Sequence, residues 1–183
     1  MAEYSEEHDP VRWYTLRDLK PSNSRQIAYD RLVELGLEVY TPMREVPGMR
    51  DVNGAKVMRP VIHNLLFVHE TKSILDAIIE KIGKLQYLFK RGGRYQEPIT
   101  VPDDDMRRFK SAAASTEYPK YYLPSEITPD MRKRRIRIYG GPLDGQEGYL
   151  LSVRGSKKRH LLVELKDFFA VSVEVNPEYI ELL

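Results

Sequence analysis

The side chains of this chain that could perform chemistry are few and scattered. Asp103, Asp104 and Asp105 follow Pro102 and could hold Mg²⁺, although an acidic start of a helix explains three consecutive aspartates better. No nucleophile elbow or comparable catalytic motif occurs. The histidines lack the short spacings that are typical of metal ligands, and they are His8, His63, His69 and His160. We therefore expect no enzyme, no cofactor and no metal site. A small hydrolase stays an open alternative, because a fold can bring distant residues together.

One glycine-rich stretch, Arg137–Leu151 (RIYGGPLDGQEGYLL), stands out instead. It begins with the alternation of a strand, turns through several glycines and a proline, and ends in a second apolar run. A glycine directly before a strand indicates a bulge, a positive φ or a close backbone contact. This order resembles the KOW motif of small SH3-like β-barrels, and the motif residues are Gly141, Pro142, Gly145 and Gly148.

Composition restricts the class of protein. The chain has 183 residues, 42% of them hydrophobic, and a nearly balanced formal charge of +2. The absence of cysteine excludes a disulfide framework and thiolate metal sites. We find neither a signal peptide nor an apolar run approaching the ~20 residues of a membrane helix. The expectation is a soluble, cytoplasmic protein of one or two domains, without a membrane partner.

The elements that must position these residues follow from periodicity and turn signals. A short N-terminal tail, residues 1–10, precedes a sequence that favours strand-helix-strand-strand-helix-strand-helix. The expected strands cover residues 11–19, 37–46, 57–70 and 85–90. The expected helices are one that starts at Asn23, one whose apolar face runs from Ile74 to Ile82, and one that starts after Pro102. This order predicts an α+β fold, an antiparallel sheet flanked by helices, over residues 11–115.

The second half of the chain has a different character. Residues 116–129 carry three prolines and three tyrosines, which favours an extended linker. From residue 130 to 183 the sequence predicts strands only, and glycines interrupt any helix at a cost of about 1 kcal/mol each. We therefore expect a small β-barrel rather than a helical hairpin in this region. Phe168 and Phe169 either pack in the core or form an exposed anchor for a partner.

The front region adds a more specific resemblance. WYTLRDL in the first strand, RPVIHNLLFVHE in the third and KRGGRYQEPITVPDDDM behind it are similar, in sequence and order, to the N-terminal domain of the NusG family. Asn64 and the run Leu66–Val68 resemble the specialised RfaH-like antiterminators of polysaccharide operons. His63 and Leu65 depart from the proline and tyrosine usual in that strand. With the KOW motif behind it, the resemblance covers nearly the whole chain.

The resemblance implies a binding site for RNA polymerase. In this family an apolar cavity of the front domain receives the clamp helices of the largest polymerase subunit. Motif positions assign cavity roles to Ile62 and Leu65, and to Trp13 and Tyr14 on the first strand. The alternative for each of these residues is ordinary core packing. Ile62 and Leu65 lie on opposite faces of a regular strand, so we predict an irregular backbone at residues 63–64.

Basic residues suggest a second kind of contact. Lys20 and Arg25 match positions that face non-template DNA in RfaH-like proteins, although a lone basic side chain is usually only solvated. Arg132–Arg137 and Arg154–His160 are basic stretches that could bind RNA or simply form soluble surface. In the family this domain binds other proteins, such as a ribosomal protein or a termination factor.

The function implied is a transcription elongation or antitermination factor that suppresses pausing or termination, in a specialised version that serves particular operons. The rival interpretation is a KOW-containing RNA-binding or ribosome-associated protein without a polymerase role.

Overall fold

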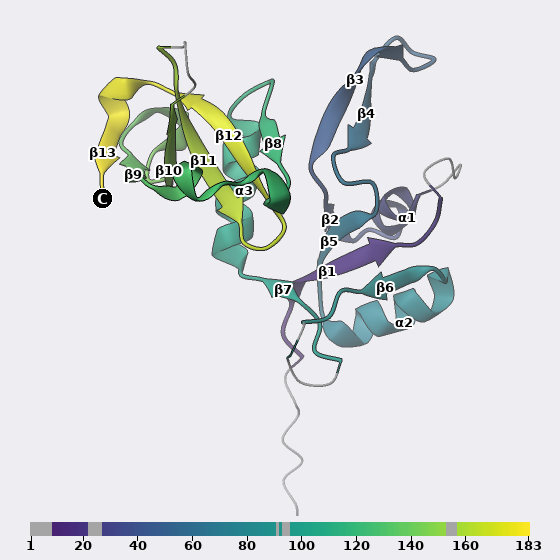
Figure 1. Cartoon of the computed structure of the whole chain (residues 1–183). Coiled ribbons are helices and arrows are strands. Elements are labelled where there is room, and N and C mark those ends of the chain that lie inside the picture. The colour runs from purple at the N-terminus through teal and green to yellow at the C-terminus, as the bar shows by residue number, and fades with distance from the viewer. Residues whose placement is uncertain (1–8, 22–26, 91, 93–95, 153–156) are drawn as a thin grey trace, which may run out of the picture. The chain divides into compact units, whose positions relative to one another are not determined.

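The computed structural model describes residues 9–21, 27–90, 92, 96–152 and 157–183. By contacts the chain divides into two compact units, Met1–Pro102 and Asp103–Leu183. Each is described by itself below (Figure 1). Among the described residues, no helix is long and apolar enough to cross a membrane.

The first unit is built on an antiparallel sheet with strand β1 at its centre. The order is β2-β5-β1-β6, and β7 also pairs with β1. Strand β1 runs beside β5 in the register Trp13↔His69 to Arg17↔Leu65. The strands are β1 (Arg12–Asp18), β2 (Glu38–Tyr40), β5 (Leu65–Glu70), β6 (Leu85–Tyr87) and β7 (Thr100–Val101). The predicted α+β class is confirmed.

Two helices pack on this sheet, α1 (Ala28–Glu34) and α2 (Lys72–Ile82). Gly36 and Gly83 follow their C-terminal ends with positive φ, a conformation that glycine adopts without steric cost. The expected helix cap at Asn23 lies outside the described residues. The carboxylate of Asp18 instead accepts the N–H of Ala28 at 2.7 Å, at the start of α1.

A separate two-stranded ribbon leaves the sheet, formed by β3 (Met43–Arg50) and β4 (Lys56–Pro60). Asn53-Gly54 lies in its tip as expected, with Gly54 at φ +80°. Two predicted strands were wrong in extent, because Thr41-Pro42 separates β2 from β3 and residues 61–64 separate β4 from β5. Proline supplies no N–H for a continuous ladder, so each long run divides between two sheets.

The second unit contains a six-stranded antiparallel sheet in the order β13-β9-β10-β11-β12-β8. The strand pairs run from one edge to the other without closing the sheet, and the region is β-structured as predicted. Its strands are β8 (Lys120–Tyr122), β9 (Arg135–Ile138), β10 (Glu147–Ser152), β11 (Arg159–Leu165), β12 (Phe169–Val175) and β13 (Ile180–Leu182). Short 3₁₀ turns connect them, at Pro124–Glu126, Pro129–Arg132, Gly141–Leu143 and Pro177–Tyr179.

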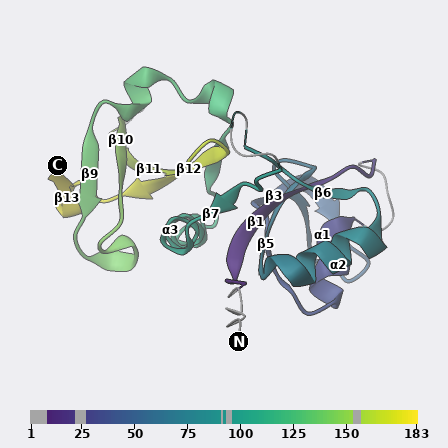
Figure 2. The ribbon, with the colours of Figure 1, turned by 90° about the horizontal axis from the view of Figure 1, so that it is seen from below.

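Helix α3 (Asp103–Ala114) belongs to this second unit. Its buried residues Met106, Phe109 and Ala112 share one helical face, and the Phe109 ring lies 5.0 Å from that of Phe169. Figure 2 shows α3 along its axis, beside β11 and β12. Phe169 is 1% exposed, so it is core rather than an exposed anchor.

The segment after α3 is also part of this unit, because β8 pairs with β12 through Tyr121↔Val171. The division therefore differs from the one expected from the sequence, in which residues 103–115 closed the front domain and residues 116–129 formed a free linker. The physical reason is the apolar face of α3, whose partners lie more than 50 residues further along the chain.

Candidate functional site

The two faces of the first sheet differ in what covers them. Strand alternation places Tyr14 and Leu16 on one face and Trp13, Thr15 and Arg17 on the other. Both helices pack on the Tyr14 face and form one buried apolar cluster with it. The cluster consists of Tyr14, Leu16, Ala28, Leu32, Leu66, Val68, Leu75, Leu85 and Tyr87. The other face carries Leu65 opposite Arg17 and Phe67 opposite Thr15. We call it the Trp13 face.

Of the four predicted polymerase-binding residues, the structure places two on this face. Trp13 and Leu65 lie there and are 4% and 8% exposed. Tyr14 lies in the helix-covered core, with its ring edge-on to Tyr87 at 5.7 Å. Burial raises the pKa of the Tyr14 hydroxyl. Two consecutive strand residues cannot share a face, so Tyr14 is removed from the candidate surface.

Trp13 is held by its neighbours on the sheet. Its ring stacks on that of His69, with centroids 4.7 Å apart and planes 14° from parallel. The His69 Nδ1 lies 3.0 Å from the Glu38 carboxylate, so adjacent strands fix the imidazole in place. His69 is therefore engaged with Trp13 and Glu38. Among the described residues, no group of three or more metal-ligating side chains occurs.

The fourth predicted residue, Ile62, lies in the irregular segment that leads into β5. The N–H of Leu65 donates to the Ile62 carbonyl at 3.3 Å, which closes a turn over residues 62–65. The predicted irregular backbone at His63 and Asn64 is confirmed by this turn. Ile62 is half-buried and lies three residues before the start of β5.

Sequence reasoning missed the residue that ties this turn to β1. The backbone N–H of Asp18 donates to the Asn64 carbonyl at 3.0 Å. Asp18 is buried, with 4% of its surface exposed. Its carboxylate accepts the backbone N–H of both Lys20 and Ala28. Asp18 thus joins the end of β1, the turn before β5 and the start of α1. An acid at the end of a strand before a helix was the available signal, but its partner lies ten residues away.

Of the two predicted nucleic-acid-binding residues, Lys20 lies among the described residues. Lys20 is half-buried and lies two residues after Asp18, whose carboxylate accepts its backbone N–H. Arg25 lies outside the described residues.

Each of the four KOW motif residues, in the loop between β9 and β10 and at the start of β10, has its own structural role. Gly141 and Gly145 have φ of +70° and +74°, a region that other residues rarely adopt. Pro142 lies in the 3₁₀ turn between them. Gly148 has an ordinary φ, but a Cβ there would overlap the Leu162 carbonyl oxygen and lie 2.9 Å from Leu161 Cδ1. The last glycine is thus required by close strand packing.

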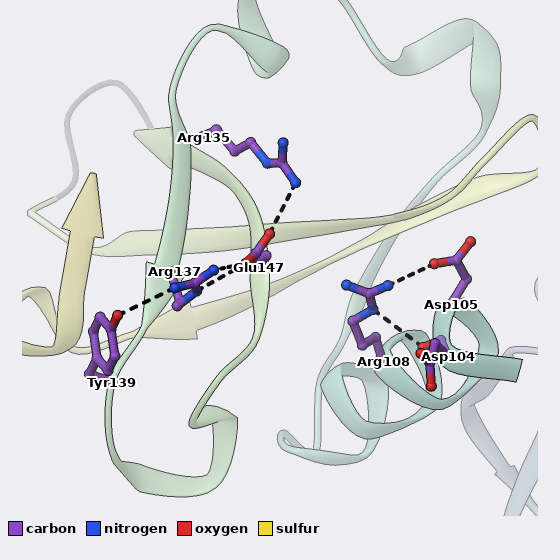
Figure 3. Close-up of polar contacts among 7 residues, drawn as sticks. All are labelled: Asp104, Asp105, Arg108, Arg135, Arg137, Tyr139 and Glu147. Carbon is purple, nitrogen blue, oxygen red and sulfur yellow. Dashed lines mark hydrogen bonds and ion pairs between the residues drawn. The ribbon is translucent and has the colours of Figure 1, made fainter. Parts of the chain in front are cut away.

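The basic side chains beside this loop are mostly neutralised within the unit. Figure 3 shows Glu147 between Arg135 and Arg137, and Arg137 also contacts the Tyr139 hydroxyl. The Arg137 hydrogen bond lowers the pKa of the Glu147 carboxyl, and hydrogen bonds to Tyr139 and Glu147 raise the pKa of Arg137. Four of the five basic residues in 132–137 are ion-paired: Arg132 with Glu164, Lys133 with Asp130, and Arg135 and Arg137 with Glu147.

A broad groove of about 850 Å³ lies between α3 and β9–β11. Its rim includes Arg108, which donates to the Asp105 carboxylate at 3.1 Å and to the Asp104 carbonyl at 3.3 Å (Figure 3). The charged side chains of the groove comprise four basic and four acidic residues: Arg108, Arg132, Arg135, Lys166, Asp105, Glu147, Glu164 and Asp167. This balance suits a protein surface better than the uniformly negative backbone of RNA.

The described residues thus form two compact units, one with a sheet whose two faces differ and one with a groove of balanced charge. Residues 11–110 match the sequence profile of a family described as "Transcription termination factor nusG". The match covers more than half of the chain, and the chain belongs to the NusG family. Members of this family are transcription factors without enzymatic activity, so the chain is, in general terms, an elongation or antitermination factor.

A solved structure titled "Domain interaction in Thermotoga maritima NusG" is similar to this chain at 14% sequence identity and a TM-score of 0.42. The similarity covers 94% of this chain and 97% of that one. No curated protein sequence matches the chain.

Proposed function

We propose that the chain binds RNA polymerase through the Trp13 face of its first unit and suppresses pausing or termination. The contact on the polymerase is the pair of clamp helices of the largest subunit. In this proposal the factor acts in the cytoplasm on particular operons, as RfaH-like paralogues do, and Lys20 and Arg25 approach the non-template DNA strand.

The observation that carries the proposal is the asymmetry of the sheet. Both helices of the first unit pack on the Tyr14 face, and the described helices of that unit leave the Trp13 face to other contacts. Trp13, Leu65 and Phe67 are nevertheless only 4%, 8% and 0% exposed, so in this proposal the partner displaces the groups that cover them. Apolar grooves commonly receive the apolar face of a partner helix. Trp13 and Leu65 form the base of the proposed groove, and Ile62 lies at its border. Aromatic residues at the centre of an interface often carry much of the binding energy.

The second unit has a separate role in this proposal, which is to bind a protein partner such as a ribosomal protein or a termination factor. Internal pairing of the basic residues in 132–137 supports a protein partner over RNA. A free phosphate-binding surface would keep such side chains available.

Ile62→Asp is the variant that tests the polymerase contact. Ile62 is half-buried, so a charge there is compatible with folding, whereas Leu65→Asp at 8% exposure also costs stability. Ile74→Asp on α2 is a matched control, because Ile74 is 46% exposed and lies on an element of the opposite face. Interface residues of this kind contribute about 2 kcal/mol or more, which corresponds to roughly 30-fold in affinity.

The measurement is a pull-down of purified RNA polymerase by each variant, accompanied by circular dichroism. We expect wild type and Ile74→Asp to retain polymerase and Ile62→Asp to lose it with an unchanged spectrum. Retention of polymerase by a folded Ile62→Asp would show that the contact lies elsewhere. Unfolding of Ile62→Asp would assign Ile62 to the core.

A further inference from the structure

The β3–β4 ribbon carries two pairs of like charges directly across its strands. Arg44 lies opposite Arg59, and Arg50 lies opposite Lys56. Residues directly opposite on antiparallel strands have Cβ atoms about 4.5–5.5 Å apart, and like charges at that distance are destabilising. Such pairs therefore need a counter-charge, either from within the protein or from a ligand.

One pair has its counter-charge within the ribbon. The Glu45 carboxylate lies 3.2 Å from Arg50 Nη1 and 2.9 Å from Lys56 Nζ, and these contacts lower the pKa of Glu45. The ribbon's other acid, Asp51, is used in the tip, where it accepts the N–H of Asn53 and of Ala55 at 2.8 Å each. Both acids of the ribbon are therefore engaged away from the remaining pair.

The other pair is exposed and has no such partner. Arg44 and Arg59 are exposed, and among the described residues neither is ion-paired. Their side chains emerge on the opposite side of the ribbon from Glu45 and Met58, the adjacent cross-strand pair. Four basic and two acidic residues give the segment 43–60 a formal charge of +2, equal to that of the entire chain. The ribbon is thus a locally basic element of the first unit.

We propose that the Arg44–Arg59 side of the ribbon is a docking surface for the phosphate backbone of duplex DNA. Arginine forms strong charge-assisted contacts with phosphate, and a bound duplex supplies the counter-charge that the pair lacks. The major groove, about 12 Å wide, admits a two-stranded β-ribbon. Single-stranded nucleic acid is usually held by stacking on aromatic rings, and residues 43–60 contain no aromatic residue.

This contact is independent of the proposed polymerase site, because it is made by a different element and is measured with the free protein. The ribbon and α2 lie at opposite ends of the first unit in Figure 1. That separation provides a control: Lys81→Gln with Lys84→Gln removes two charges at the end of α2. The test variant, Arg44→Gln with Arg59→Gln, removes the same two charges from the ribbon.

The experiment is fluorescence anisotropy of a labelled 20-base-pair duplex with the full chain, titrated at several salt concentrations from about 20 mM upward. Each lost phosphate contact reduces the slope of log K against log[salt] by about 1, so the ribbon variant should lower it by about 2. The control should keep the wild-type slope. Thermal unfolding should show the ribbon variant to be at least as stable as wild type, because a repulsive pair has been removed.

Three results would overturn the proposal. One is the absence of duplex binding by wild type at the lowest salt. Another is an equal loss of affinity in the ribbon variant and the control, which would indicate a general field rather than a docking surface. The third is competition by single-stranded DNA or RNA of the same sequence that equals or exceeds competition by the duplex.

Discussion

Replacement of Phe109 by alanine tests whether α3 belongs to the second unit. Phe109 is fully buried, and its ring lies 5.0 Å from that of Phe169 and 6.4 Å from that of Tyr121. Truncation of a buried phenylalanine to alanine costs about 3–5 kcal/mol. A unit the size of residues 103–183 has a total stability of roughly 4–12 kcal/mol. The substitution therefore removes a large part of that stability.

The expected result is a lower melting temperature for the second unit alone. Each kcal/mol shifts the Tm of a domain of this size by about 4–8 °C, so Phe109→Ala should lower it by at least about 12 °C. Hydrogen exchange should show faster exchange in β11 and β12 and unchanged exchange in β1 and β5. Arg107→Ala, on the exposed side of the same helix, is the control. Faster exchange confined to β1 and β5 would refute the assignment and restore α3 to the front domain.

Other predictions concern single residues. Gly148→Ala should lower the free energy of unfolding by about 1–3 kcal/mol, measured in urea, because its Cβ overlaps a backbone carbonyl; an unchanged midpoint would contradict the close packing. Asp18→Ala should cost about 2 kcal/mol by leaving two N–H groups without an acceptor, with partial recovery in Asp18→Asn; equal stability of all three proteins would contradict this. Hydrogen bonding to Ser73, at the start of α2, lowers the pKa of Asp9 below its usual 3.8. Its stabilisation is therefore present above that pH and lost as the pH falls through the lower folded-state pKa, so the difference in amide exchange between wild type and Asp9→Asn should vanish in acid.

Local features of the fold could be predicted from the sequence because their causes are local. Apolar spacing from Ile74 to Ile82 and the stop at Gly83 predicted α2. The glycine loop predicted a turn between two strands, and the observed positive φ of Gly141 and Gly145 agrees with it. The irregular backbone at His63 and Asn64 followed from the need to turn a strand between Ile62 and Leu65.

Features that depend on distant partners could not be predicted. The acidic start and apolar face of α3 were visible, but nothing local indicated that Phe109 packs on Phe169. The Asp18 carboxylate caps a helix across a ten-residue gap, which no local capping pattern includes. The Arg44–Arg59 pair depends on ribbon register, which a bulge between Glu45 and Arg50 shifts.

The placement of Tyr14 shows a different kind of error. Alternation along β1 already required Trp13 and Tyr14 to lie on opposite faces, so the sequence excluded a shared cavity for both. It did not indicate which face the helices cover. The cluster of Tyr14 with Leu32 and Leu75 decides that point, and it places Trp13 and Leu65 on the opposite face, where the proposed partner would bind.

The most direct test of the central claim is transcription by purified RNA polymerase through a pause site and a terminator. The template should carry the upstream region of an operon that the factor serves. We predict that wild type and Ile74→Asp shorten the pause and increase read-through, whereas folded Ile62→Asp does neither. Unchanged pausing and read-through with wild type, or full activity of a folded Ile62→Asp, would contradict the proposed function.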